Sequence, residues 1–247
     1  MFTLLGQRQG NLIEQMDAKD ADCKHLEQTY ADFYALNKLI SQWNRVYAKF
    51  IRRHAKEIQR QGNIFKVCDV GCGGGDIAFL LFKWLKKDGI NAHIIGIDID
   101  NRAIAWAKAN RIVSAETAQV NKKKSVGLFF ECISTSELIH RNHKVDLVIN
   151  NHVLHHIPFE KINPFLTECA ALGRRVICND LERSSLAYSL FSLCFPLRYR
   201  SSFIYQDGRI SLKKSFRKKE LEELSSIGWR VQRLFPFRLL LMYEAKS

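Results

Sequence analysis

Apolar and polar positions follow two different rhythms along the chain. Between residues 22 and 58 the apolar positions recur every three or four residues, which is typical of amphipathic helices. From residue 66 onward, short apolar runs alternate with longer segments of helical spacing. The runs predict strands at residues 66–70, 92–99, 127–133, 145–149, 175–178, 229–234 and 239–245. This alternation predicts an α/β fold whose sheet is mostly parallel, is covered on both faces and ends in a β-pair.

The same pattern divides the chain into two parts. Helices predicted at 22–39 and 40–58 make residues 1–61 an N-terminal helical cap, although the first fifteen residues show no clear pattern. Residues 62–247 hold all the predicted strands and are a usual size for one α/β domain. Within this domain, residues at about 184–210 form a long insertion rich in Leu, Phe and Tyr, which we interpret as a lid.

A glycine-rich turn joins the first predicted strand to a buried helix, in the segment KVCDVGCGGGDIAFLL at residues 66–81. Such a turn directs free backbone N–H groups at one point, which favours the polar end of a ligand. The spacing opposes a dinucleotide fingerprint, because Asp76 stands where its third glycine belongs. A P-loop is excluded, because no Gly-Lys-Ser/Thr sequence follows.

The order Asp69, Gly71, Gly73, Gly75 closely resembles motif I of the class I S-adenosylmethionine-dependent methyltransferases. The resemblance implies a Rossmann-like seven-stranded methyltransferase sheet, mostly parallel with an antiparallel last strand, and S-adenosylmethionine as the cofactor. It also implies that Asp69 and the backbone of Gly71, Cys72 and Gly73 hold the methionine part. A catalytic role for the Cys72 thiol is not favoured.

The second predicted strand ends in Gly-Ile-Asp at Asp98, followed by Ile99. An acidic residue at the tip of this strand can accept hydrogen bonds from both ribose hydroxyls. The resemblance makes Asp98 the ribose ligand, with Ile99 beside it, whereas Asp100 is interpreted as a helix N-cap. Ile133 stands where many family members have an acidic residue for the adenine, so the adenine contact is left to backbone groups.

The segment VDLVINNHVLHHI, residues 145–157, is the second candidate for chemistry. Asn150 ends the strand at the carboxyl edge of the sheet, where ligands bind in such folds, and we place it with the cofactor-binding residues. If the following turn is helical, His152, His155 and His156 share one face. They pack and cap the turn, or one of them is a general base, His155 before His152, or they bind zinc or iron. The metal alternative is the least favoured, and we assign no metal ligand.

Composition narrows the class of partner only slightly. The formal net charge is +13, with basic clusters near residues 52–60, 122–124 and 209–219. Nucleic acid is therefore possible but not favoured, because no separate binding motif is present. The seven cysteines form no Cys-x-x-Cys pair and fit a reduced, cytoplasmic protein. We expect neither a signal peptide nor a membrane span, and the oligomeric state is left open.

These observations predict methyl transfer from S-adenosylmethionine to a small molecule, most simply to a hydroxyl of an aromatic or polyketide-like metabolite. The apolar insertion with Arg198, Arg200 and Arg209 at its edges favours an aromatic or acyl acceptor that carries an acidic group. Looser similarity of residues 179–184 and 211–221 to bacterial small-molecule methyltransferases, of the polyketide, phenol and ubiquinone type, points the same way. The alternatives are an RNA or protein methyltransferase and a non-catalytic scaffold that binds S-adenosylmethionine.

Overall fold

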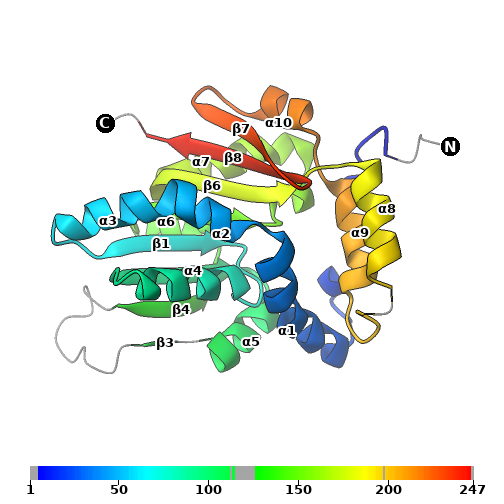
Figure 1. Ribbon diagram of the computed structural model, residues 1–247, viewed down its shortest axis with the longest axis horizontal. Helices are drawn as coiled ribbons and strands as arrows, with labels where there is room; N and C mark the ends of the chain where they lie inside the picture. Colours follow the sequence, from blue (N-terminus) through cyan, green and yellow to red (C-terminus); the bar gives the residue numbers. More distant parts are fainter. Residues whose placement is uncertain (1–4, 112, 115–125, 197, 246–247) are drawn as a thin grey trace.

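One mixed β-sheet organises the chain in the computed structural model, which describes residues 5–111, 113–114, 126–196 and 198–245. The strands lie in the order β3-β4-β2-β1-β5-β6-β8-β7 (Figure 1). They are β1 Phe65–Val70, β2 Ala92–Asp98, β3 Val113–Ser114, β4 Gly127–Cys132, β5 Val145–Asn151, β6 Gly173–Leu181, β7 Trp229–Leu234 and β8 Arg238–Glu244.

The pairing confirms the predicted seven-stranded sheet. Strands β4, β2, β1, β5 and β6 are parallel, β8 runs antiparallel to β6, and β7 runs antiparallel to β8. The two-residue strand β3 adds a short antiparallel edge to β4, which the sequence pattern did not predict. The basic cluster at residues 122–124 lies outside the described residues.

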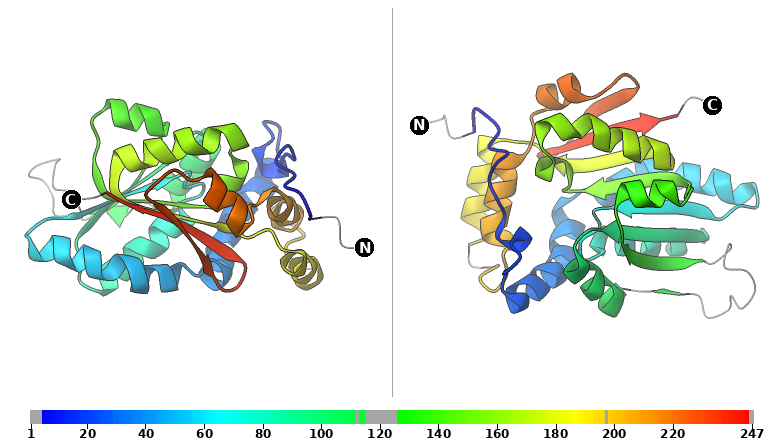
Figure 2. Two further views of the ribbon diagram at one scale, coloured as in Figure 1. Left: turned by 90° about the horizontal axis from the view of Figure 1, so that it is seen from above. Right: turned by 180° about the vertical axis from the view of Figure 1, so that it is seen from behind.

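Helices cover both faces of the sheet, because neighbouring residues of each buried strand face opposite sides. The helices are α1 Cys23–Ile40, α2 Trp43–Val46, α3 Arg52–Arg60, α4 Asp76–Lys87, α5 Asn101–Arg111, α6 Thr135–His140, α7 Ile162–Leu172, α8 Ser185–Cys194, α9 Ile204–Lys214 and α10 Lys218–Leu224. In β1, Val67 packs into the core beneath α2–α5, whereas Cys68 packs into the core beneath α6, α7 and α10. Figure 2 shows the resulting three layers. A π-helical turn, Tyr47–Ile51, joins α2 to α3, so the predicted helix at 40–58 is present in three pieces.

A third group of helices stands beyond the carboxyl ends of the parallel strands. Helices α8 and α9 pack on each other and lie beside α1 (Figure 1). They occupy the segment that we interpret as a lid, although α9 continues past residue 210 to Lys214. Among the described residues, no helix combines the length and apolarity needed to cross a membrane.

Residues 5–22, here called the N-terminal strap, run along α9 toward α1 (Figure 2). The Arg8 guanidinium donates to the carbonyl oxygens of His155 at 2.9 Å and Ile157 at 3.0 Å. The backbone N–H of Gln9 donates to the Lys213 carbonyl at 3.0 Å. The strap is thus tied to both the sheet edge and the α8–α9 group, although its sequence shows no periodicity.

Candidate functional site

Several positions of the glycine turn between β1 and α4 have a backbone conformation that only glycine adopts without strain. Gly71, Gly73 and Gly75 have φ of 68°, 51° and 73°, in the left-handed region. The N–H groups of Gly71 and Cys72 donate to the Ile97 carbonyl at 2.8 and 3.0 Å, which fixes the turn against the end of β2. The first and second strand tips therefore meet at one point, as the sequence predicts.

Asp98 lies at that point and faces a large cavity. Its carboxylate accepts the N–H of Gly73 and the N–H of Asp100, both at 2.9 Å. Burial raises the pKa of Asp98, and these two hydrogen bonds oppose the rise. Cys72 lines the same cavity, and burial raises the pKa of its thiol well above the usual value. Ile99 stands at the rim with 82% of its surface exposed.

Two of the predicted cofactor residues lie behind the cavity wall. Asp69 is 1% exposed and accepts the N–H of Ala78 in α4, and burial raises its pKa well above the usual value. The Asn150 amide is fully buried and donates to the Cys178 sulfur at 3.1 Å. Neither residue lines the cavity, whereas the next residue, Asn151, does.

Asn37 and Asp76 reach the cavity beside the glycine turn, and no sequence motif indicated Asn37. The Asn37 amide donates to Asp76 at 2.9 Å, while its own carbonyl oxygen is buried without a hydrogen-bond partner among the described residues. Burial raises the pKa of Asp76, against the effect of Asn37 and Arg111. Asn37 and Asp76 thus place an acceptor oxygen and a carboxyl group beside the glycine turn, where the resemblance places the methionine part of the cofactor.

The histidine loop, residues 152–156, is not one helical face. His152 has φ 61°, and only Leu154–His156 form a 3-10 turn. The Nε2 atom of His152 contacts the buried Arg238 guanidinium. Burial and that cation lower the pKa of His152 well below its usual value, so the ring is neutral and Nε2 accepts the hydrogen bond.

His155 is held between two carboxyl groups. Its Nδ1 lies 2.7 Å from Asp180 Oδ1, and its Nε2 lies 3.4 Å from Glu14 Oε1, without the geometry of a hydrogen bond. Burial alone would lower the pKa of His155, but Asp180 and Glu14 outweigh it and raise the pKa to about 9. Asp180 has its own pKa held well below the usual range, against burial, chiefly by His155. At neutral pH a protonated His155 is a cation and cannot accept a proton.

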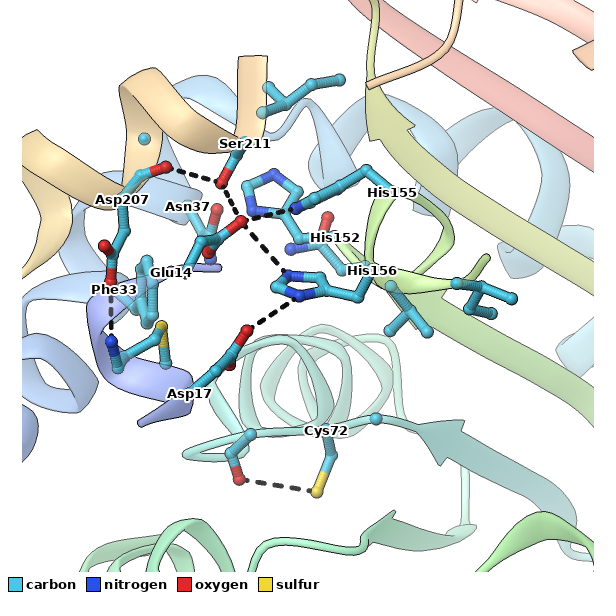
Figure 3. Close-up of a pocket in the computed structure, with 18 of the residues that line it drawn as sticks. Glu14, Asp17, Phe33, Asn37, Cys72, His152, His155, His156, Asp207 and Ser211 are labelled. Carbon is cyan, nitrogen blue, oxygen red and sulfur yellow. Dashed lines mark hydrogen bonds and ion pairs between the residues drawn. The ribbon is translucent and has the colours of Figure 1, made fainter. Parts of the chain in front are cut away.

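Glu14, from the N-terminal strap, is the centre of this cluster (Figure 3). Its Oε1 accepts from Ser211 at 2.9 Å and from Lys214 at 3.3 Å, and lies 3.6 Å from His156 Nε2. Burial would raise the pKa of Glu14, but His155 and the neighbouring donors lower it to about 2. No sequence pattern indicated Glu14, because its partners are far away along the chain.

The strap is also fixed directly after Glu14. Asp207 in α9 accepts the N–H groups of Gln15 at 2.8 Å and Met16 at 3.0 Å. Asp17 Oδ2 lies 3.2 Å from His156 Nδ1. The strap therefore closes one side of the cavity with carboxylates.

The cavity has a volume of about 1180 Å³ and two chemically different ends. Near the glycine turn its wall is polar. The opposite wall, from α1, α8 and its C-terminal end, α9 and the turn before β8, is mostly apolar and includes Phe33, Leu36, Ile40, Leu190, Phe191, Phe195, Ile204, Leu212 and Phe237. A typical small-molecule pocket holds about 300–1,000 Å³, so this cavity has room for a cofactor and an acceptor together. Arg198, Arg200 and Arg209 are not among the lining residues.

Comparisons with known proteins agree with this geometry. Residues 62–164 match the sequence model of a family described as "Methyltransferase domain". That match confirms the predicted enzyme class, a methyltransferase, and covers both the glycine turn and the histidine loop.

Solved structures share the fold at low sequence identity. The plantazolicin methyltransferase BpumL in complex with SAH has a TM-score of 0.56 and 14% identity, covering 91% of this chain and 95% of that chain. The plantazolicin methyltransferase BamL, in complex with a triazolic desmethylPZN analog and SAH, has a TM-score of 0.56 and 16% identity, covering 91% and 96%. No match was found among curated proteins. The predicted Rossmann-like methyltransferase fold is confirmed.

Proposed function

We propose that the enzyme methylates a hydroxyl of an apolar small molecule, aromatic or polyketide-like. One observation carries the proposal: a single cavity joins the glycine turn and Asp98 to an apolar wall from the lid helices α8 and α9. The methyl carbon forms a bond to the acceptor oxygen while its bond to sulfur breaks and the electron pair stays on sulfur. The hydroxyl proton leaves, and the enzyme's task is alignment, desolvation and charge stabilisation.

The cofactor would lie along the polar end of the cavity. In this proposal the backbone of Gly71, Cys72 and Gly73 faces the methionine part, and Asp98 binds the ribose. Ile99 covers the adenine at the rim. Asp69 and Asn150 act from behind the wall, by holding the glycine turn and the end of β5 in place.

Asn37 and Asp76 would face the cofactor's ammonium group, which is the part of the molecule that needs acceptors. The Asn37 carbonyl oxygen supports this role, because a buried acceptor without a partner costs free energy until a donor arrives. A ligand ammonium group would supply that donor.

His155 and His152 are the proposed catalytic residues, with roles adjusted to their charges. A charged His155 would stabilise the oxygen anion that forms as the acceptor hydroxyl loses its proton. Neutral His152 would be fixed by Arg238 as a hydrogen-bonding group beside the acceptor. Proton removal is then left to solvent or to the acceptor's own ionisation.

Peptide or RNA acceptors are the competing proposal. Structures similar to this chain are named plantazolicin methyltransferases, and the net charge of +13 favours polyanions.

Calorimetric titration with S-adenosylmethionine, with NADH as the control ligand, tests the cofactor site first. We expect micromolar binding that Asp98→Asn weakens strongly and Asp32→Asn, outside the cavity, leaves unchanged.

Transfer of a labelled methyl group then separates the acceptor classes. Phenols with alkyl or acyl chains should be methylated, whereas short RNA and peptides should not. Methylation of RNA, with salt-sensitive retention, would overturn the small-molecule proposal. Cofactor binding without transfer to any class of acceptor would favour the non-catalytic scaffold.

A further inference from the structure

Three side chains that can ligate a metal ion converge on one wall of the cavity. Glu14 comes from the N-terminal strap, and His155 and His156 come from the loop after β5. Their ligand atoms all lie within 4.8 Å of one another, and all three residues line the cavity (Figure 3). This set differs from the three histidines considered from the sequence, because His152 is occupied by Arg238.

The separations fit ligands of one ion better than they fit direct ion pairs. Glu14 Oε1 lies 3.4 Å from His155 Nε2 and 3.6 Å from His156 Nε2. Hydrogen-bonded ion pairs are shorter, at about 2.7–2.9 Å. Two ligands at about 2.0–2.2 Å from a tetrahedral zinc ion stand roughly 3.3–3.6 Å apart. His155 Nε2 is also buried without a hydrogen-bond partner among the described residues.

The His155 imidazole is oriented by a carboxylate on its other nitrogen, since His155 Nδ1 lies 2.7 Å from Asp180. Metal-bound histidines are usually held in this way, because the outer carboxylate fixes the tautomer and leaves Nε2 free to bind. His156 Nδ1 lies 3.2 Å from Asp17 and accepts a hydrogen bond from the Lys214 ammonium at 3.2 Å. In that tautomer the proton of neutral His156 is on Nε2, so an ion at this nitrogen has to displace either the proton or the lysine.

We propose that Glu14, His155 and His156 bind one divalent transition-metal ion of the zinc type, with an open position toward the cavity. Two imidazoles and one carboxylate suit zinc and similar ions better than magnesium. The ion would take the place of the proton on His155 and link the strap to the histidine loop. Its role in activating a hydroxyl rests on the proposed function: an acceptor oxygen on the open position would be held as its anion.

Lys214 is the group that competes with such an ion. Its ammonium lies 3.3 Å from Glu14 Oε1 and 3.2 Å from His156 Nδ1, and it is 3% exposed. The lysine and the ion would share one carboxylate oxygen, so the lysine should weaken metal binding. Lys214→Met then distinguishes a metal site from a cluster in which the lysine is the only cation that pairs with Glu14.

The test titrates chelator-treated full-length protein with Zn²⁺ and with Mg²⁺, and records Co²⁺ absorption as a probe of ligand type. We expect one Zn²⁺ per chain, no Mg²⁺ binding, and a cobalt spectrum without the charge-transfer band of a thiolate ligand. Glu14→Gln and His156→Gln should weaken Zn²⁺ binding at least about tenfold. Lys214→Met should strengthen it, and His140→Gln, in an exposed histidine outside the cluster, should leave it unchanged.

Equal Zn²⁺ affinity in wild type, Glu14→Gln and His156→Gln, or no binding by folded protein, would overturn the proposal. A cobalt–thiolate band would also overturn it, because it would place the ion on a cysteine. Thermal unfolding of each variant shows whether it is folded. Titration of the same metal-free protein with S-adenosylmethionine separates this proposal from the proposed function. A protein that does not bind Zn²⁺ can still bind S-adenosylmethionine, and the reverse also holds.

Discussion

Two glycines of the same turn should respond differently to the same substitution. Gly73 and Gly75 both have positive φ, which costs an alanine roughly 1–2 kcal/mol. At Gly73 an added Cβ meets nothing within 4 Å, so this backbone cost stands alone. At Gly75 the added Cβ would lie 2.4 Å from Phe130 Cε1, and overpacking adds about 1–3 kcal/mol. We therefore expect Gly73→Ala to lose about 1–2 kcal/mol and Gly75→Ala about 2–5 kcal/mol of unfolding free energy.

Urea unfolding without cofactor measures this difference in stability. Calorimetric titration measures the affinity of each variant for S-adenosylmethionine. Gly73 lines the cavity and Gly75 does not, so the open space at Gly73 is where a ligand would lie. The less destabilised variant, Gly73→Ala, should therefore show the larger loss of cofactor affinity per folded molecule. Equal unfolding free energies, or normal affinity in Gly73→Ala, would refute the assignment of this turn.

Two further predictions concern groups that burial perturbs. Burial raises the pKa of Asp207 to about 6 from 3.8, so the folded state binds more protons between these values. The stability that Asp207 contributes is therefore greatest below pH 4 and is lost as the pH rises through 6. Across this range the unfolding free energy of wild type, relative to that of Asp207→Asn, should fall by up to about 3 kcal/mol. Urea unfolding of both proteins at each pH measures this difference. A pH-independent difference would contradict this. Burial also raises the pKa of the Cys72 thiol, so mass spectrometry after iodoacetamide treatment at pH 8 should find exposed Cys132 and Cys194 modified well before Cys72; equal rates in folded protein would contradict the burial.

The sheet and the glycine turn were predictable because their signals are local. Buried parallel strands read as short apolar runs, and a strand followed by glycines and an apolar helix leaves few other conformations. The position of Asp98 at the sheet edge was predictable for the same reason, since a residue at a strand tip needs no tertiary information to be placed there. The predicted bounds of most strands agree with the structure to within a few residues.

The side that a residue faces was harder to predict than its place along the strand. Side chains alternate between the two faces with a period of two, so a shift of one residue moves a side chain from the cavity to the core. Asn150 and Asn151 differ in this way, because Asn151 lines the cavity and Asn150 is buried behind it. The sequence of β5 shows two adjacent asparagines and does not distinguish them.

The strap was missed because its structure depends on distant partners. Glu14 is held by Ser211 and Lys214, about two hundred residues away, and it has no helical or strand periodicity of its own. Asn37 was missed in the same way, since it reads as a polar position in an amphipathic helix until α4 is placed beside it. Residues whose role depends on a tertiary neighbour give no signal in a single sequence.

The charge of the cavity is opposite to the charge of the chain. The protein carries a net charge of +13, yet the ionisable residues that line its cavity are mostly acidic. They are Glu14, Asp17, Asp76, Asp98, Asp100, Glu168 and Asp207, against Lys161 and Arg238, with the three histidines of the loop. An acidic, partly buried wall attracts a cofactor with a sulfonium and an ammonium group, and it repels a phosphate backbone. The basic surface therefore does not favour RNA as the acceptor, because the methyl group would be transferred inside a cavity whose own charge opposes a polyanion. The same wall also opposes the acidic acceptor suggested by the sequence, and it favours a neutral molecule whose hydroxyl becomes negative only as it reacts.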